Sequence, residues 1–344
     1  MSGVTRVLVV DDSAYVRKVV SQMLSRNGDI QVVGIARDGN EALDLVEELR
    51  PDVVTCDLVM PELDGVGFVR AQMSRRPMPI VIVSVANESG ELVLSALDAG
   101  AVDFVQKPTA LATDRLLEIG QELIDKVKAA ASSHVHAPVI LDAARVVTSA
   151  GVRPRGMFDV IVIGISTGGP QALKLLIPRL PSNLPVPVAV VLHMPVGYTQ
   201  LYAEKLNETS AIHVCEASDQ GRLEAGTVYI APAGRHLTIE RSGEEVWTRL
   251  DARPLDTLYR PSVDVLFQSA ANVFGSRVLG LVMTGMGSDG REGAAWIKAK
   301  GGTVFTEAED SCVVYGMPRS VVEAGLSDAA FDLGHMADAI LEQV

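Results

Sequence analysis

Ser166, His193 and Asp289 are the residues of this sequence with the clearest combined chemistry. A hydroxyl, an imidazole and a carboxylate are the three parts of a serine nucleophile, in which the imidazole takes the serine proton and the carboxylate orients the ring. Ser166 lies in Gly164-Ile-Ser-Thr-Gly168, which has the G-x-S-x-G spelling of a nucleophile elbow. Taken alone, that spelling leaves open a Gly-rich turn that cradles a phosphate or only packs.

The three residues follow apolar runs that predict buried parallel strands. These runs are Val160–Ile163, Val186–Leu192 and Leu279–Met283. Because the carboxyl ends of parallel strands lie at one edge of a sheet, we expect the three side chains to meet there. A helix predicted directly after Ser166 would point backbone N–H groups at a developing oxyanion. The chain order Ser, His, Asp differs from that of α/β-hydrolases, which excludes a simple assignment to that fold.

Each member of the set has a simpler interpretation. His193 at a strand end can be an ordinary loop residue with satisfied hydrogen bonds. Asp289 can be the N-cap of the helix predicted at Gly293–Ala299. His213 and His236 are rival imidazoles. The recurrence of the same strand-end placement favours the three-residue site over these alternatives.

The composition is that of a soluble globular protein, with 344 residues, of which 48% are hydrophobic and 21% charged. A formal net charge of −13 argues against nucleic-acid binding. The first residues resemble neither a signal peptide nor a membrane span, so we expect a cytoplasmic monomer without membrane insertion. Cys56, Cys215 and Cys312 are far apart, which suits a reducing compartment. Cys215 and Cys312 are rival nucleophiles, but neither has a basic neighbour, and inert thiols are favoured.

The first 125 residues alternate short apolar runs with amphipathic stretches. Strands are predicted at Val7–Val10, Val32–Ala36, Val53–Cys56, Ile80–Val83 and Asp103–Val105. Helices are predicted at Ala14–Leu24, Asn40–Leu49, Gly65–Met73, Glu91–Ala99 and Leu111–Lys128. Five β/α units of this length predict a doubly wound parallel sheet, with its chemistry at the carboxyl ends of the strands.

Charged and hydroxyl side chains follow four of these strands: Asp11 and Asp12, then Asp57, Ser84 and Lys107. Three carboxylates without a nearby arginine would repel one another, so we expect them to share a hard divalent cation. Lys107 offers a point charge and Ser84 a hydroxyl, both of which suit a phosphoryl group.

The stretch Asp57-Leu-Val-Met-Pro-Glu-Leu-Asp-Gly65, taken with this set, resembles the receiver domain of bacterial two-component response regulators over residues 5–125. The resemblance implies that Asp57 accepts a phosphoryl group from a histidine kinase. It implies Mg²⁺ ligation by Asp11, Asp12, Asp57 and the backbone carbonyl of Val59. The implied phosphoryl-contact and switch residues are Ser84, Lys107 and Phe104.

Residues 126–156 lose periodicity and predict a linker between a receiver domain, residues 1–125, and a second domain, residues 157–344. The linker contains His134 and His136. Two residues apart, these would not face each other on a helix, so a metal site formed by them alone is not expected.

Six segments of the second half resemble the catalytic domain of the chemotaxis methylesterase CheB family. They are Gly164–Pro170, His193–Pro195, Val228–His236, Arg260–Asp264, Thr284–Gly290 and Ser311–Pro318. The resemblance covers residues 158–330 and implies an α/β methylesterase domain that needs no cofactor. It implies hydrolysis of γ-glutamyl methyl esters on the cytoplasmic helices of chemoreceptors, with release of methanol. Deamidation of receptor glutamines is also implied.

By position in that family, Ser166 would be the nucleophile, His193 the general base and acid, and Asp289 the orienting carboxylate. The backbone at Thr167 and Met286 would form the oxyanion pocket. A hydrolase fused to a receiver suggests that the unphosphorylated receiver blocks the site and that phosphorylation opens it. The alternative is a receiver-linked regulatory or interaction protein of a non-motility chemosensory pathway, with a vestigial or differently targeted esterase site.

Overall fold

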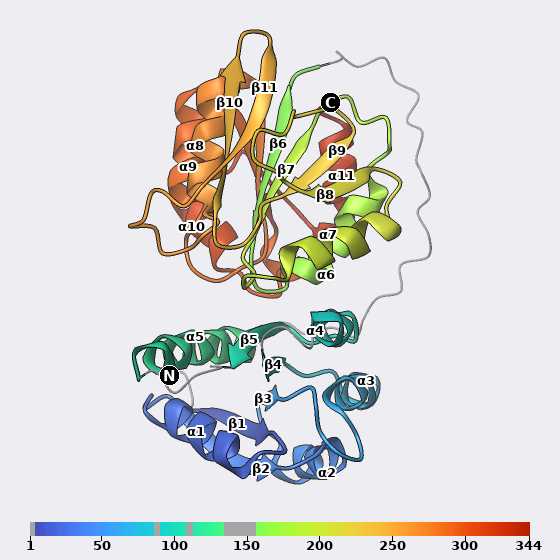
Figure 1. Cartoon of the computed structure of the whole chain (residues 1–344), viewed down its shortest axis with the longest axis vertical. Coiled ribbons are helices and arrows are strands. Elements are labelled where there is room, and N and C mark those ends of the chain that lie inside the picture. Colours follow the sequence, from blue (N-terminus) through green and yellow to red (C-terminus); the bar gives the residue numbers. More distant parts are fainter. Residues whose placement is uncertain (1–3, 86–89, 108–112, 134–155) are drawn as a thin grey trace. The chain divides into compact units, whose positions relative to one another are not determined.

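The computed structural model describes residues 4–85, 90–107, 113–133 and 156–344. The chain divides into two compact units, Met1–Ile140 and Leu141–Val344. Each is built on its own parallel sheet, with helices on both faces (Figure 1). The predicted fold class, two doubly wound parallel-sheet α/β domains, is confirmed.

The first unit has five strands in the order β2-β1-β3-β4-β5, all parallel. The strands are β1 (Thr5–Val10), β2 (Ile30–Ala36), β3 (Val53–Cys56), β4 (Ile80–Val85) and β5 (Asp103–Lys107). The helices are α1 (Ala14–Ser25), α2 (Gly39–Leu49), α3 (Gly65–Arg75), α4 (Gly90–Asp98) and α5 (Thr113–Ala131). This is the flavodoxin-like strand order, in which the chain reverses direction across the sheet between β1 and β3.

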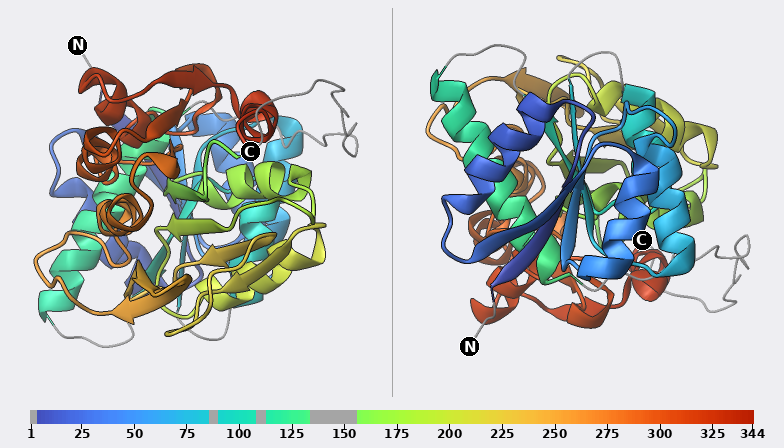
Figure 2. Two further views of the ribbon diagram at one scale, coloured as in Figure 1. Left: turned by 90° about the horizontal axis from the view of Figure 1, so that it is seen from above. Right: turned by 90° about the horizontal axis from the view of Figure 1, so that it is seen from below.

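Helices α1 and α5 pack together on one face of this sheet, while α2, α3 and α4 pack in sequence on the other (Figure 2, right). Residues Val7–Val10 of β1 and all four residues of β3 are buried, as expected for strands covered on both faces. The two acidic segments therefore leave the sheet side by side at its switch point.

The second unit has a seven-stranded parallel sheet in the order β14-β13-β12-β6-β7-β9-β8. Its strands are β6 (Val160–Ile165), β7 (Val188–Leu192), β8 (His213–Glu216), β9 (Thr227–Ile230), β12 (Val278–Val282), β13 (Thr303–Glu307) and β14 (Ala329–Phe331). An antiparallel hairpin, β10 (His236–Ser242) and β11 (Glu245–Asp251), forms a separate two-stranded sheet.

The α-helices of this unit are α6 (Gly169–Leu176), α7 (Thr199–Glu208), α8 (Val263–Phe274), α9 (Arg291–Ala299), α10 (Met317–Glu323) and α11 (Leu333–Leu341). Short 3₁₀ turns are η1 (Ile177–Arg179), η2 (Gly275–Arg277) and η3 (Glu309–Ser311). Helix α8 packs on α9 and on strand β10, so the hairpin lies on the α8 side of the sheet (Figure 1). In the sheet, β7 lies beside β6 on one edge of that strand, and β12, which comes later in the chain, lies beside β6 on the other edge. The switch point therefore adjoins β6.

The predicted elements of both units are present, with ends that differ by a few residues. The start of the helix predicted from Leu111 lies outside the described residues, as do His134, His136 and most of the predicted linker. In the described part of the chain, no helix is both long and apolar enough to cross a membrane.

Candidate functional site: a Ser-His-Asp set and an acidic phosphoryl-type site

Ser166, His193 and the loop that carries Asp289 follow three adjacent strands of the second sheet. Ser166 follows β6, His193 follows β7, and Asp289 lies seven residues beyond β12. The backbone ties these ends together, because His193 N–H donates to Ile165 O at 3.1 Å and Ser166 N–H donates to Thr284 O at 3.0 Å. The predicted gathering of three strand ends at one edge is therefore present.

The turn after Ser166 runs directly into helix α6. Its N-cap, Gly168, has a left-handed φ of 78° and offers no side-chain cap. A β-carbon there would also meet the side chain of Val313 at 2.6 Å, so glycine is required for both conformation and space. The first N–H groups of α6 consequently open beside Ser166, as an elbow requires.

His193 and Asp289 form the direct contact of the site, with Nε2–H donating to Oδ2 at 2.8 Å. Asp289 also accepts from the hydroxyl of Ser262 at 2.9 Å, and from Val263 N–H and Asp264 N–H at 2.8 and 3.0 Å. Burial alone would raise the pKa of Asp289. The hydrogen bonds and charge of His193, with the backbone N–H groups, outweigh burial and lower that pKa. Asp289 is therefore ionised.

The interpretation of Asp289 as N-cap of the following helix is wrong. The N-cap of α9 is Gly290, without a side-chain cap bond. Asp289 instead accepts from the first N–H groups of α8, a helix that precedes it by about two dozen residues in the chain. The carboxylate thus sits at the positive end of a helix dipole, which favours its negative charge.

Because Nε2 of His193 donates to Asp289, the basic lone pair of the ring lies on Nδ1. That nitrogen is buried and has no hydrogen-bond partner among the described residues. In the chymotrypsin arrangement the carboxylate takes Nδ1 and the serine takes Nε2, so the ring of His193 has the reverse orientation relative to its carboxylate. The Ser166 hydroxyl, on a half-buried residue, makes no hydrogen bond within the described ranges.

Two residues missed by the sequence reasoning lie at this site, one against His193 and one against Thr284, whose carbonyl accepts the Ser166 N–H. Tyr259 stacks on His193, with ring centroids 4.2 Å apart. Glu307, fully buried, accepts from Thr284 N–H at 2.9 Å and from the Ser311 hydroxyl at 3.1 Å. Burial raises the pKa of Glu307 to about 7. No sequence motif indicated either residue. Glu307 does end a short, largely apolar run, and an acidic residue in such a run is a signal that could have been noticed.

The expected oxyanion groups lie on the two loops around Ser166. The Ser166 amide is already used by Thr284 O and cannot serve. Thr167 is buried and its carbonyl accepts the Thr284 hydroxyl at 3.0 Å, which fixes the turn. Met286 is partly buried, and its N–H has no hydrogen-bond partner in the described part of the chain. A backbone N–H without a partner can donate a hydrogen bond to a developing oxyanion.

The rival groups do not join the site. His213 is exposed at the start of edge strand β8. His236 is fully buried and hydrogen-bonded through both ring nitrogens, so it is not a free base. Burial raises the pKa of both Cys215 and Cys312, which disfavours the reactive thiolate.

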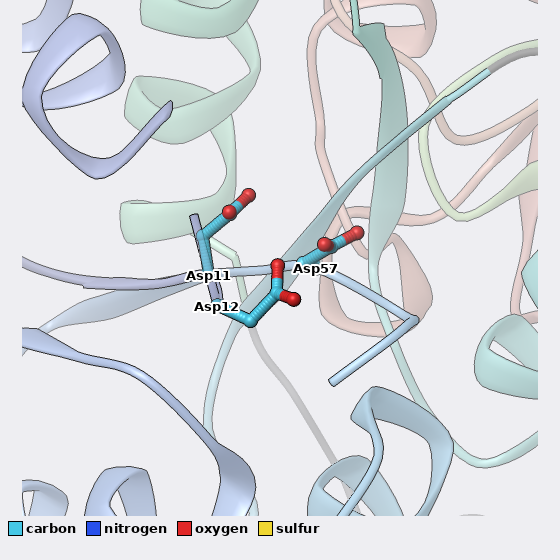
Figure 3. Close-up of side chains that lie close together, drawn as sticks. All are labelled: Asp11, Asp12 and Asp57. Carbon is cyan, nitrogen blue, oxygen red and sulfur yellow. The ribbon is translucent and has the colours of Figure 1, made fainter. Parts of the chain in front are cut away.

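In the first unit, Asp11 and Asp12 follow β1 and Asp57 follows β3, and their carboxylates lie together (Figure 3). One oxygen of each can be chosen so that all three lie within 4.8 Å of one another, which suits a shared cation. Lys107 Nζ contacts Asp11 Oδ2 at 2.5 Å and Asp57 Oδ2 at 2.8 Å. The donor set is all oxygen, the kind that Mg²⁺ prefers.

Burial, with the Asp57 charge adding to it, raises the pKa of Asp11 despite Lys107. For Lys107, burial alone would lower the pKa, but Asp11 and Asp57 outweigh it and raise that pKa. The lysine therefore stays charged at this edge, where a phosphoryl group could replace part of its carboxylate contact.

The other predicted receiver residues are placed as follows. Ser84 is buried on β4 and Phe104 is buried on β5. The Phe104 carbonyl accepts Lys126 Nζ at 2.6 Å, and its ring lies 5.6 Å from that cation. Val59 is 63% exposed and lies two residues after Asp57.

Both units are similar to known protein families. Residues 161–340 match the family model described as CheB methylesterase, and residues 7–119 match that of the response regulator receiver domain. Protein-glutamate methylesterase/protein-glutamine glutaminase 5 of Myxococcus xanthus is 54% identical over 94% of this chain and 93% of its own length. The similarly named enzyme 1 of Saccharophagus degradans is 41% identical over 98% of this chain and 99% of its own length.

Among solved structures, the crystal structure of the Thermotoga maritima CheB methylesterase catalytic domain is similar to the second unit. It is 41% identical, with a TM-score of 0.53, and the match covers 54% of this chain and 99% of that chain.

Proposed function

The chain belongs to the CheB methylesterase family, and we propose that Ser166, His193 and Asp289 are the catalytic residues of its protein-glutamate methylesterase activity. The enzyme is a carboxylic-ester hydrolase with an N-terminal receiver domain, of the kind that serves adaptation in chemotaxis. The observation that carries the site proposal is the 2.8 Å hydrogen bond from His193 Nε2 to Asp289, at the strand end adjoining Ser166.

The chemistry follows from the ring nitrogen that this bond leaves basic. Nδ1 of His193 accepts the Ser166 proton as the hydroxyl oxygen attacks the ester carbonyl of a γ-glutamyl methyl ester. The oxyanion is stabilised by backbone N–H groups at Met286 and Thr167. The imidazolium then protonates departing methoxide, and methanol leaves. Water, deprotonated by the same nitrogen, hydrolyses the acyl-enzyme to the glutamate carboxylate.

The relatives' names also include protein-glutamine glutaminase activity, and the same groups can perform it. An amide carbonyl is attacked in the same way, and His193 protonates the amide nitrogen, which then leaves as ammonia where the ester releases methanol. We propose cytoplasmic helices of chemoreceptors as the substrate for both reactions and the cytoplasm as the location of the enzyme. A vestigial site is not favoured, because the relatives that match nearly the whole chain are named as enzymes.

For the receiver we propose that Asp57 is phosphorylated by a histidine kinase of the chemotaxis type. Mg²⁺ would be held by Asp11, Asp12, Asp57 and the Val59 carbonyl, where it supplies charge neutralisation during phosphoryl transfer. Ser84 and Lys107 would contact the phosphoryl oxygens, with Phe104 as the switch aromatic. The proposed domain boundaries are residues 1–125, 126–156 and 157–344, in a monomeric protein that binds no nucleic acid and inserts into no membrane.

The test of the catalytic assignment is Ser166→Ala, assayed by methanol release from methyl-labelled chemoreceptor membranes. We expect release to fall to the uncatalysed level while Asp57 phosphorylation is unchanged. Cys215→Ala is the matched control and should retain full activity, because its thiol is inert. Hydrolysis that persists in Ser166→Ala would show that the nucleophile is a different residue.

Regulation is tested separately by removing residues 1–150. If the unphosphorylated receiver restrains the esterase, the truncated protein should have a higher basal rate of methanol release than the intact chain. An unchanged or lower rate would contradict the blocking hypothesis and leave the catalytic assignment standing.

A further inference from the structure

His236 and Ser262 follow Asp289 in one continuous chain of hydrogen bonds. Ser262 donates its hydroxyl to Asp289 Oδ1 at 2.9 Å and its backbone N–H to Nδ1 of His236 at 3.2 Å. Both residues are buried, with 4% of the surface of Ser262 and 0% of that of His236 exposed. Because Nδ1 accepts, Nε2 carries the ring proton, and it donates to the Pro254 carbonyl at 3.1 Å. His236 is therefore neutral and held in a single tautomer.

Ser262 is the N-cap residue of helix α8, yet its side chain does not cap that helix. A serine at this position ordinarily accepts a hydrogen bond from the second or third N–H of the helix. Here the hydroxyl donates to Asp289, and Asp289 accepts from Val263 N–H and Asp264 N–H in its place. The orientation of Asp289 thus depends on where α8 begins.

The start of α8 depends in turn on the backbone of Ser262. The partner of its N–H is His236, at the first position of strand β10, which packs on α8. A buried N–H that loses its acceptor is costly, so this bond constrains the position of Ser262.

We propose that His236 is a positioning residue for ester hydrolysis, whose neutral ring fixes the Ser262 backbone and, through Ser262 and the start of α8, aims Asp289 at His193. The inference rests on the proposed catalytic roles of His193 and Asp289. Protonation of His236 would turn Nδ1 into a second donor facing the Ser262 N–H, and the bond would be lost. The site would then work only while His236 is neutral.

Three charged groups face His236. They are Asp251, its pairing partner on β11, Arg260 in the loop after β11, and Asp289. Burial lowers the pKa of His236 below its ordinary 6.5, and Arg260 lowers it further. The Pro254 hydrogen bond and the charges of Asp289 and Asp251 partly oppose this. The ring is accordingly neutral at pH 7 and becomes protonated only in acid.

The first experiment compares His236→Leu with His236→Asn in the full-length protein, by methanol release from methyl-labelled chemoreceptor membranes. Leucine removes the acceptor, and we expect kcat to fall by roughly 10- to 100-fold with KM within about twofold. Asparagine offers an oxygen where Nδ1 lies, and kcat should stay within about threefold of the parent. His213→Asn, at an exposed histidine outside the network, is the control and should match the parent.

The second readout is the acid limb of the pH profile of kcat, which a purely structural role would not alter. The limb should fall more steeply with decreasing pH in the parent, where protonation of His236 also stops the reaction, than in His236→Asn, which has no ring to protonate. Equal slopes in the two proteins would overturn the inference. This comparison still decides the question where His236→Leu fails to fold.

A folded His236→Leu protein with kcat within twofold of the parent would also overturn the inference. That result would leave the catalytic proposal intact, provided that Ser166→Ala is inactive. If Ser166→Ala remains active, the catalytic proposal itself has failed, so the two failures are distinguishable.

Discussion

Tyr259 lies flat against the imidazole of His193, with ring centroids 4.2 Å apart and planes inclined by 17°. The aromatic face limits rotation of the His193 ring. In the proposed mechanism it also places electron density over the imidazolium that forms when His193 holds the serine proton. Tyr259 belongs to the loop between β11 and α8, so the segment that leads to Ser262 contacts the ring as well.

Tyr259→Ala should therefore lower kcat for methanol release by about 3- to 10-fold, which corresponds to the usual worth of an aromatic pair. Tyr259→Phe keeps the stacked face and should stay within about twofold of the parent. A phenylalanine variant as slow as the alanine variant would contradict this, because the hydroxyl, and not the ring face, would then be responsible.

Glu307 is expected to make the stability of the protein depend on pH. Its pKa is raised to about 7 in the folded state by burial, above the ordinary value of 4.5, so the folded state binds more protons between these values. Stability then falls as pH rises through that window. Relative to the parent, Glu307→Gln should gain up to about 3 kcal/mol in free energy of unfolding between pH 4.5 and 7.5.

Urea unfolding across that pH range measures the difference. Glu323→Gln, at an exposed glutamate of α10, is the control and should follow the parent curve. Parallel curves for the parent and Glu307→Gln would show that Glu307 has the same pKa in the folded and unfolded states.

The strand-end placement of Ser166, His193 and Asp289 was predictable because β6, β7 and β12 are short, almost wholly apolar runs. Such runs form buried parallel strands, and the residue types that follow them then share an edge. The cluster of carboxylates in the first unit was predictable for the same reason, since Asp11 and Asp57 follow the buried strands β1 and β3.

The supporting residues were not predictable in this way. Ser262 and Glu307 each form a hydrogen bond with a residue more than 20 positions away, and no local pattern fixes such distances. The choice of Nε2 of His193 as the donor to Asp289 depends on ring orientation, which the sequence does not encode locally. The β10–β11 hairpin, whose strands mix charged and apolar residues, was likewise not anticipated.

Gly285 is expected to tolerate no side chain. A β-carbon there would lie 2.4 Å from Met317 Sδ, 2.8 Å from Ser166 Cβ and 3.1 Å from the Ser166 amide nitrogen. Contacts under 3.0 Å force the turn at Ser166, the proposed nucleophile, to move, and a displacement on the order of 1 Å costs about 100-fold in rate. Gly285→Ala should therefore reduce kcat by roughly that factor. Gly334→Ala, with open space at the β-carbon, is the control, and equal activities in the two variants would contradict the packing argument.

The acidic site of the first unit should bind Mg²⁺ through Asp12 as well as the buried pair. Lys107 already pairs with Asp11 and Asp57, whereas Asp12 is exposed. A cation at this site would therefore also contact the Asp12 carboxylate, which does not pair with the lysine. A ligand that binds only the folded state stabilises it, by about 1.4 kcal/mol at tenfold excess over Kd. The unfolding temperature of the first unit, measured by calorimetry of the full chain, should therefore rise when Mg²⁺ is added.

Asp12→Asn removes one charged ligand without disturbing the core, and most of the Mg²⁺-dependent shift should disappear. Asp44→Asn, at an exposed aspartate of α2, keeps the same change in net charge away from the site and should retain the full shift. Equal shifts in the two variants would mean that Mg²⁺ acts through general screening and not through a site. In that case Lys107 would be the only counter-charge of the Asp11–Asp57 pair among the described residues, and phosphorylation of Asp57 should be insensitive to the Asp12 substitution.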